Sequence, residues 1–184
     1  QREIFPYLDS EMPILRPLNY PPGAPGRGYI SRDGVLVVNL IGRTFIGSFD
    51  CPFQTIDKLL TELKPNPPII IVDFHAEATS EKMAMGRYLD GRVSAILGTH
   101  THVGTIDAQV FPQGSAYVTD IGMVGPTDSI IGDDTESVLQ RFLTAMPHRL
   151  SVGHGKTMLN AISVRVDDQT GKALGIERIY REVS

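Results

Sequence analysis

The stretch Ile69-Ile70-Ile71-Val72-Asp73-Phe74-His75 decides how this chain folds. Its four consecutive β-branched residues are typical of a strand that is buried on both faces of a sheet. A second apolar run covers 93–97, and the residues between the two runs predict a helix over 80–90. A strand, a helix and a strand in this order predict a βαβ unit with parallel neighbouring strands, and therefore an α/β fold.

The flanking sequence predicts further elements around this unit. We expect strands over 35–41, 116–119, 158–166 and 174–180, and helices over 54–63 and 135–146. The last two strands are predicted to form a hairpin across 167–171. The helix over 80–90 is expected to have Thr79 as its N-cap and Gly91 just past its end. In the helix over 135–146, the apolar residues Val138, Leu139, Phe142, Leu143 and Met146 form one stripe. The first 34 residues carry six prolines and four glycines, so we expect loops there.

Length and composition restrict the class of protein. The 184 residues are 41% hydrophobic and 21% charged, which predicts one globular domain over 1–184. The net charge of −4 predicts no nucleic-acid partner, because a polyanion would be repelled. The longest apolar runs are too short to span a bilayer, so no membrane partner is expected. With Cys51 as the one cysteine, no intrachain disulfide can form, which fits a cytoplasmic protein.

Three of the five histidines lie at the ends of predicted strands. His75 ends the first strand, and the segment Gly98-Thr99-His100-Thr101-His102 follows the second. The carboxyl ends of parallel strands meet at one edge of a sheet, where α/β folds place their sites. Imidazole is a common ligand of borderline metals, and two imidazoles two residues apart in extended backbone point the same way. We therefore predict a metal site at His75, His100 and His102; the alternative is three polar residues at a sheet edge.

Several polar residues near these histidines admit two interpretations. Asp73 either orients a ligand histidine or is an ordinary hydrogen-bonded strand-end residue. Glu77 and Glu81 lie close to His75 in sequence, and Glu81 either joins the site or complements the helix N-terminus. Asp120 either borders the pocket or forms a tight turn with the glycine that follows it.

Other reactive residue types carry weaker signals. Arg16 and Arg43 either bind phosphate or form surface ion pairs. His148 and His154 have no partner spacing, so we expect them to be structural or exposed. Cys51 precedes a proline without a nearby histidine, and no serine lies in a Gly-x-Ser-x-Gly turn. The sequence thus predicts no protein nucleophile.

Two motifs resemble a known family. The segment Gly98 to His102 resembles the Gly-x-His-x-His motif of calcineurin-like metallophosphoesterases. The segment Asp73 to Lys82 resembles a narrower branch, the bacterial 2′,3′-cyclic-nucleotide phosphodiesterases. The similarity extends over essentially the whole chain and includes the segments 15–20, 38–43, 119–126 and 140–142.

The resemblance implies a fold, a cofactor and a reaction. The implied fold is a metallophosphoesterase-like four-layer α/β/β/α sandwich. The implied cofactors are two divalent or mixed-valence metal ions (Fe, Mn or Mg), with His75 and His100 binding one and His102 the other. The implied reaction is hydrolysis of 2′,3′-cyclic nucleotides or related small phosphoesters by a metal-bound hydroxide. Homo-oligomerisation is also expected, and no substrate-binding residue is assigned.

The chain departs from the family pattern at its start. Members of the family carry a Gly-Asp-x-x-Gly-like turn, a bridging Glu beside an Asn, and a Gly-Asn-His motif, none of which occurs in this sequence. We therefore expect the chain to match the C-terminal part of the enzyme, with the first strands missing and the general-acid histidine upstream of Gln1. No catalytic residue is assigned within the chain, and a version extended at the N-terminus should be the better phosphodiesterase. Two alternatives stay open: a non-catalytic metal-binding or oligomer-forming piece, and a phosphomonoesterase of the same superfamily.

Overall fold

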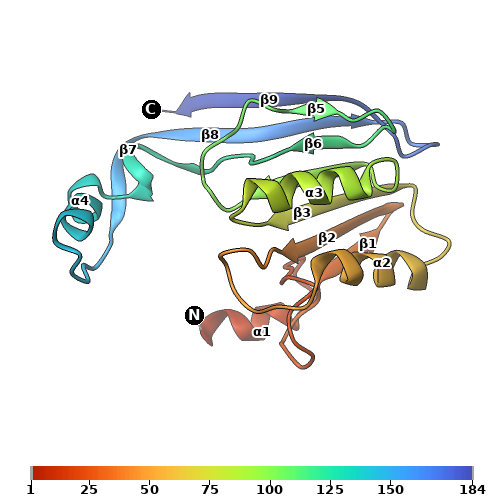
Figure 1. Cartoon of the computed structure of the whole chain (residues 1–184), viewed down its shortest axis with the longest axis horizontal. Helices are drawn as coiled ribbons and strands as arrows, with labels where there is room; N and C mark the ends of the chain where they lie inside the picture. Colours follow the sequence, from red (N-terminus) through yellow and green to blue (C-terminus); the bar gives the residue numbers. More distant parts are fainter. Residues whose placement is uncertain (1, 184) are drawn as a thin grey trace.

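The structure is a computed structural model that describes residues 2–183 (Figure 1). The helices are η1 (Arg2–Ile4), α1 (Phe5–Leu8), α2 (Pro52–Glu62), α3 (Thr79–Leu89) and α4 (Thr135–Thr144). The strands are β1 (Tyr29–Arg32), β2 (Val35–Ile41), β3 (Ile69–His75), β4 (Ala95–Thr99), β5 (Gln109–Val110), β6 (Ala116–Val118), β7 (Val124–Asp133), β8 (Val152–Val166) and β9 (Ala173–Val183). No helix within residues 2–183 combines the length and apolar character needed to cross a membrane.

A six-stranded sheet forms the centre of the fold. Its strand order is β1-β2-β3-β4-β6-β5, in which β2, β3, β4 and β6 run parallel and the two edge strands run antiparallel to their neighbours. The register pairs His75 with Ile41 on one side and with Thr99 on the other. The carboxyl ends of the central strands therefore meet at one edge, which confirms the predicted parallel pairing.

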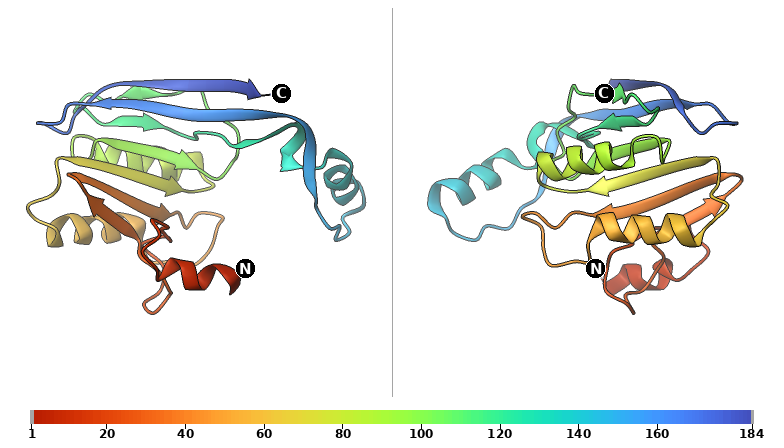
Figure 2. Two further views of the ribbon diagram at one scale, coloured as in Figure 1. Left: turned by 180° about the vertical axis from the view of Figure 1, so that it is seen from behind. Right: turned by 45° about the vertical axis from the view of Figure 1, so that its right-hand side comes forward.

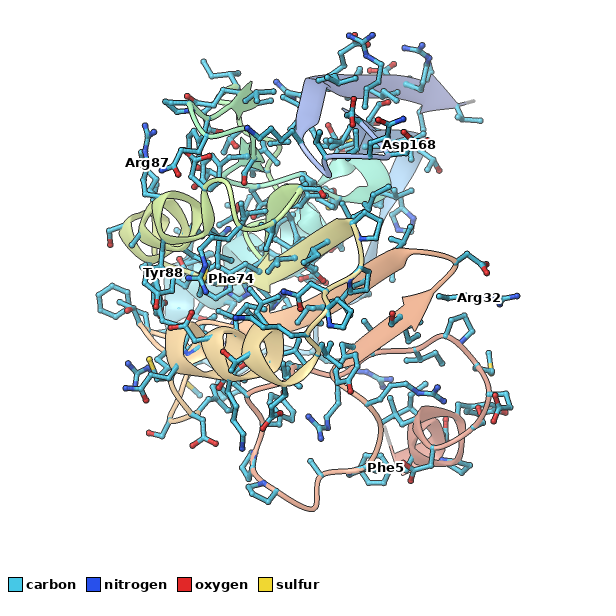
Figure 3. All side chains as sticks on the ribbon, turned by 90° about the vertical axis from the view of Figure 1, so that its right-hand side faces the viewer. Phe5, Arg32, Phe74, Arg87, Tyr88 and Asp168 are labelled. Carbon is cyan, nitrogen blue, oxygen red and sulfur yellow. The ribbon has the colours of Figure 1, made fainter. Side chains whose placement is uncertain are left out.

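Successive side chains of β3 point alternately into two different environments. Ile70, Val72 and Phe74 are buried and belong to the core beneath α2 and α3. Figure 3 shows Phe74 between the sheet and these two helices. Because successive side chains of a strand point to opposite faces, Asp73 and His75 lie on the face away from the helices.

A second sheet covers part of that other face. It has the order β7-β8-β9, and its members β8 and β9 form the long hairpin that the alternation predicted. Ala173 and Ile176 of β9 pack with Val164 of β8 against Ala95 and Ala116 of the larger sheet. Small alanines at this contact let the two sheets approach closely.

Part of the second sheet extends beyond the sandwich. The outer ends of β7 and β8, together with α4 between them, project from the body of the molecule (Figures 1 and 2). We call residues 130–152 the α4 arm. The α/β class and the two stacked sheets are thus as expected, and among residues 2–183 the helix layer of the sandwich consists of α2 and α3.

The structure corrects several predicted details. The first 34 residues are not all loop, because Tyr29–Arg32 forms β1 against β2 through the Asp33-Gly34 turn. The N-cap of α3 is Ala78 rather than Thr79, and it makes no side-chain cap bond. Strand β4 begins two residues later than predicted and continues to Thr99.

The prediction for the last helix needs a larger correction. Of the predicted apolar stripe, only Val138 is buried. The helix lies on the projecting arm, where the body of the fold does not reach its outer face (Figure 2). The apolar pattern was read correctly, but no core of residues 2–183 covers it.

Candidate functional site

The ends of β3 and β4 bring two of the three predicted histidines into contact. His75 Nε2 lies 3.0 Å from His100 Nδ1. The two rings meet edge to face, with centroids 4.7 Å apart and an interplanar angle of 81°. The parallel register of β3 and β4 accounts for this contact, since it places Thr99 directly beside His75.

The backbone around His100 is unusual. Gly98 passes so close to the neighbouring strand that an added Cβ would lie 1.8 Å from the Thr119 carbonyl oxygen, so only glycine fits there. His100 and His102 then adopt positive φ angles of 117° and 66°. Such angles are strained for residues with a Cβ, and strain of this kind concentrates at functional sites.

A chain of hydrogen bonds orients His75. Its Nδ1 lies 3.1 Å from Thr99 Oγ1, and this hydroxyl donates to Asp73 Oδ1 at 2.9 Å. The other carboxylate oxygen of Asp73 accepts from Asn39 Nδ2 at 2.6 Å. Because the Thr99 hydroxyl donates its hydrogen to Asp73, its oxygen accepts a hydrogen bond from His75 Nδ1–H. This tautomer leaves the lone pair of His75 on Nε2, the atom that faces His100.

Glu77 determines which ring nitrogen of His100 carries the proton. Its Oε2 lies 2.7 Å from His100 Nε2, which therefore carries the proton, and the lone pair of the ring lies on Nδ1. The two nitrogens that face each other thus both present lone pairs when both rings are neutral. Two lone pairs 3.0 Å apart repel each other unless a cation lies near them, and imidazole nitrogens paired with outer carboxylates are typical of metal ligands.

The surroundings of His75 favour its neutral form. Burial lowers its pKa, and the neighbouring His100 lowers it further, while the charge of Asp73 acts in the opposite direction. A neutral imidazole is the form that binds metals.

His102 lies apart from the other two histidines. Its Nδ1 is 2.7 Å from the carbonyl oxygen of Ile131, at the base of the α4 arm. A carbonyl can only accept, so Nδ1 carries the proton and Nε2 keeps its lone pair. Within residues 2–183, no group of three or more His, Cys, Asp or Glu side chains converges as a ready metal site. The assignment of all three histidines as ligands therefore stays a prediction.

A buried ion pair supports the loop that carries His100. Lys82 Nζ of α3 lies 2.8 Å from Asp120 Oδ2, and both side chains are 1% exposed. The same carboxylate oxygen accepts from the backbone and hydroxyl of Thr101, at 2.9 and 2.8 Å, and Oδ1 accepts from Gly122 N at 2.9 Å. Burial alone would raise the pKa of Asp120, but the hydrogen bonds from Lys82, Gly122 and Thr101 outweigh it and hold the pKa below its usual range.

The remaining candidates mostly have structural partners. Glu81 accepts hydrogen bonds from the backbone of Arg43 and Thr44, so it fastens the loop after β2 to α3. Arg16 donates to the carbonyl of Pro17 at 2.7 Å. His148 and His154 are exposed, and Cys51 is the residue before α2.

Sequence reasoning missed Asn39, Thr99 and Lys82. Asn39 did carry a signal, because it interrupts the apolar strand β2. Lys82 carried none, since a lysine in the first turns of a helix is usually exposed. Thr99 lies inside the recognised motif, but its role depends on the register of two strands.

Comparison with known proteins places these features in context. Residues 1–179 match the profile of a family described as YmdB-like protein. The chain is 49% identical to the 2′,3′-cyclic-nucleotide 2′-phosphodiesterase of Bacillus subtilis, over 97% of this chain and 69% of that protein. The crystal structure of a hypothetical protein from Thermus thermophilus matches with a TM-score of 0.92 and 45% identity, over 99% of this chain and 72% of that one. A Mycoplasma pneumoniae protein described as a novel phosphatase matches with a TM-score of 0.90 and 32% identity, over 99% and 68%.

Proposed function

Because the chain belongs to the YmdB-like protein family, we propose that it is a metal-dependent phosphodiesterase acting on 2′,3′-cyclic nucleotides or related small phosphoesters. The name of the Bacillus subtilis relative supports the class of substrate. The observation that carries the metal dependence is the pair of facing nitrogens, His75 Nε2 and His100 Nδ1, at 3.0 Å. The tautomers of the two rings leave the lone pairs of these two facing nitrogens free to bind one cation.

Of the Fe, Mn and Mg ions that the family resemblance implies, the imidazole donors suit iron best, because Mn²⁺ and Mg²⁺ prefer oxygen ligands. His75 and His100 would hold one ion, and His102 would contribute to a second. Two bound divalent ions supply Lewis-acid activation of water and neutralise the charge that develops on a phosphoryl group. The lack of a credible serine or cysteine nucleophile agrees with this chemistry.

The residues of this chain orient the imidazoles. Asp73 and Thr99 hold the proton of His75 at Nδ1, so its Nε2 stays free to bind. Glu77 does the same for His100 by accepting from Nε2. Losing such outer partners typically lowers metal affinity about 10- to 100-fold.

Elemental analysis of purified variants tests the metal site. The His100→Ala variant should lose most bound metal and most hydrolysis of a 2′,3′-cyclic nucleotide assayed with added Mn²⁺. The His148→Ala variant is the matched control and should keep both, because His148 is an exposed residue of the arm. Equal metal content in the two variants would overturn the assignment.

A pair of substitutions at Thr99 tests the orienting chain. Thr99→Val removes the hydroxyl at nearly constant volume and should weaken metal binding about 10- to 100-fold. Thr99→Ser keeps the hydroxyl and should restore the affinity. A similar loss in both variants would show that Thr99 acts only through packing.

A phosphomonoesterase is the second candidate function. The description of the Mycoplasma pneumoniae relative as a phosphatase favours it. Comparing kcat/KM for a 2′,3′-cyclic nucleotide with that for the corresponding nucleoside monophosphate separates the two functions. We further propose that the protein is cytoplasmic, in keeping with its single cysteine, and homo-oligomeric, as the family resemblance implies.

A further inference from the structure

The α4 arm contains a groove between its helix and its strands. The groove has a volume of about 380 Å³, which lies within the range of about 300–1,000 Å³ that is typical of small-molecule sites. Its apolar lining consists of Ile130, Ile131, Val138, Phe142 and Leu150. Val138 is buried, whereas Phe142 is 80% exposed and leaves its aromatic ring open to a ligand. We call this cavity the arm groove.

The arm groove begins beside the proposed metal site. Ile131 lines the groove, and its carbonyl oxygen lies 2.7 Å from His102 Nδ1. The other ring nitrogen of His102, Nε2, is the atom left free to bind a metal. One imidazole ring and one residue therefore separate the groove from the proposed site. Figure 1 shows the same relation at larger scale, because the arm projects on the side of the molecule toward which β2 and β3 end.

The backbone at this junction is strained. Ile131 and Gly132 adopt positive φ angles of 51° and 105°. A β-branched residue such as isoleucine rarely has a positive φ angle, because its branched Cβ makes this conformation costly. The pairing of β7 with β8 is also irregular here, between Asp128 and Asp133. Strain of this kind concentrates at active sites and at segments that hold ligands, so the junction has the character of a ligand-binding position.

Two polar residues complete the lining of the arm groove. They are Asp133 and Arg141, and within residues 2–183 neither of them forms an ion pair. A carboxylate accepts hydrogen bonds, whereas a guanidinium donates them. The edge of a nucleobase carries both donors and acceptors, and its flat faces stack on aromatic side chains. Asp133 and Arg141 together with Phe142 therefore supply the three kinds of contact by which proteins bind a base.

We infer that the arm groove binds the base of the nucleotide substrate, with Phe142 stacking on the base. The inference rests on the proposed function, which places the phosphate of the nucleotide at His75 and His100. In a cyclic nucleotide the ribose separates the phosphate from the base, and His102 with Ile131 separates the metal site from the groove in the same way. The groove thus makes the chain prefer cyclic nucleotides to small phosphoesters that lack a base.

Steady-state kinetics with two substrates tests the role of Phe142. Adenosine 2′,3′-cyclic phosphate and the five-membered cyclic phosphate of glycerol contain the same reactive ring, but only the first carries a base. With added Mn²⁺, Phe142→Ala should lower the ratio of kcat/KM for the adenosine substrate to kcat/KM for the glycerol substrate about tenfold, a usual effect of losing a base–aromatic contact. Leu143→Ala should leave this ratio unchanged, because Leu143 is 79% exposed on the same helix but does not line the groove. Equal changes in the two variants would overturn the inference.

Calorimetric titration with adenosine separates this inference from the proposed function. Adenosine has no phosphate, so its binding to the groove requires neither a metal nor hydrolysis. The unmodified chain should bind adenosine, Phe142→Tyr should keep the affinity because it keeps an aromatic ring, and Phe142→Ala should lower it about tenfold. Circular dichroism of each variant establishes that α4 remains folded.

The outcomes of the titration are distinct. A failure of the unmodified chain to bind adenosine would overturn the inference, and so would equal affinities of the unmodified chain and Phe142→Ala. Binding of adenosine that Phe142→Ala weakens would support the groove even if neither cyclic phosphate is hydrolysed. In that case the lack of hydrolysis would contradict the proposed function alone.

Discussion

The buried ion pair between Lys82 and Asp120 predicts a large loss of stability when one partner is removed. Both side chains are 1% exposed, and their charged atoms lie 2.8 Å apart. Removing one member of such a pair leaves an uncompensated buried charge, which typically costs about 3–5 kcal/mol. Lys82→Met keeps the length of the side chain. Because Asp120 retains hydrogen bonds from Thr101 and Gly122, we expect a loss of about 3 kcal/mol, at the lower end.

Equilibrium unfolding in urea, followed by circular dichroism, measures this loss. The control is Lys58→Met, because Lys58 forms an exposed i,i+4 pair with Glu62 at 3.8 Å. Pairs of this kind contribute about 0.2–0.5 kcal/mol, so the control should change little. A double variant, Lys82→Met with Asp120→Asn, removes both charges and should lose less than the two single losses combined. A loss below about 1 kcal/mol for Lys82→Met would refute the reasoning.

Two further predictions concern single residues near the site. Gly98→Ala should destabilise the protein by about 3 kcal/mol or more, because the new Cβ would lie 1.8 Å from the Thr119 carbonyl oxygen. The control is Gly125→Ala, whose new Cβ would have no atom nearer than 3.5 Å and should cause no comparable loss of stability. Thermal unfolding of both variants measures the difference. Burial opposes ionisation of Asp107, but hydrogen bonds from Thr105 and Thr119 outweigh it and hold its pKa below the usual range. Its contribution to stability is therefore complete above the unfolded pKa of about 3.9 and is lost as the pH falls through the folded value, so Asp107→Asn should flatten the fall in stability below about pH 4.

Local sequence was sufficient to predict the centre of the fold. The β-branched run at 69–72 can bury both of its faces only inside a sheet, and the 25 residues from His75 to His100 leave room for one crossover helix. Those two facts predicted that the ends of β3 and β4 meet, and the structure confirms it. The contact of His75 with His100 follows from the same pattern.

Tertiary structure decided the partners of the polar groups. Asn39, Asp73, Thr99 and His75 are joined by hydrogen bonds between residues 24 to 34 positions apart, through the register of three strands. An apolar pattern shows which face of a strand is buried, but it does not determine which residues of neighbouring strands are paired. For the same reason, no local signal indicated that Lys82 would meet Asp120, 38 residues away.

The helix of the arm shows the same limit most clearly. Its periodicity determined that one face of α4 is apolar, and that much was correct. Periodicity does not show what covers such a face, because a face buried in the core of its own chain and a face buried against a second chain have the same pattern of apolar residues. Only the projection of the arm from the two sheets revealed that Leu139, Phe142, Leu143 and Met146 lie outside the core (Figure 2). The physical reason is that burial depends on the distant segments that surround a helix, and those segments are set by the whole fold.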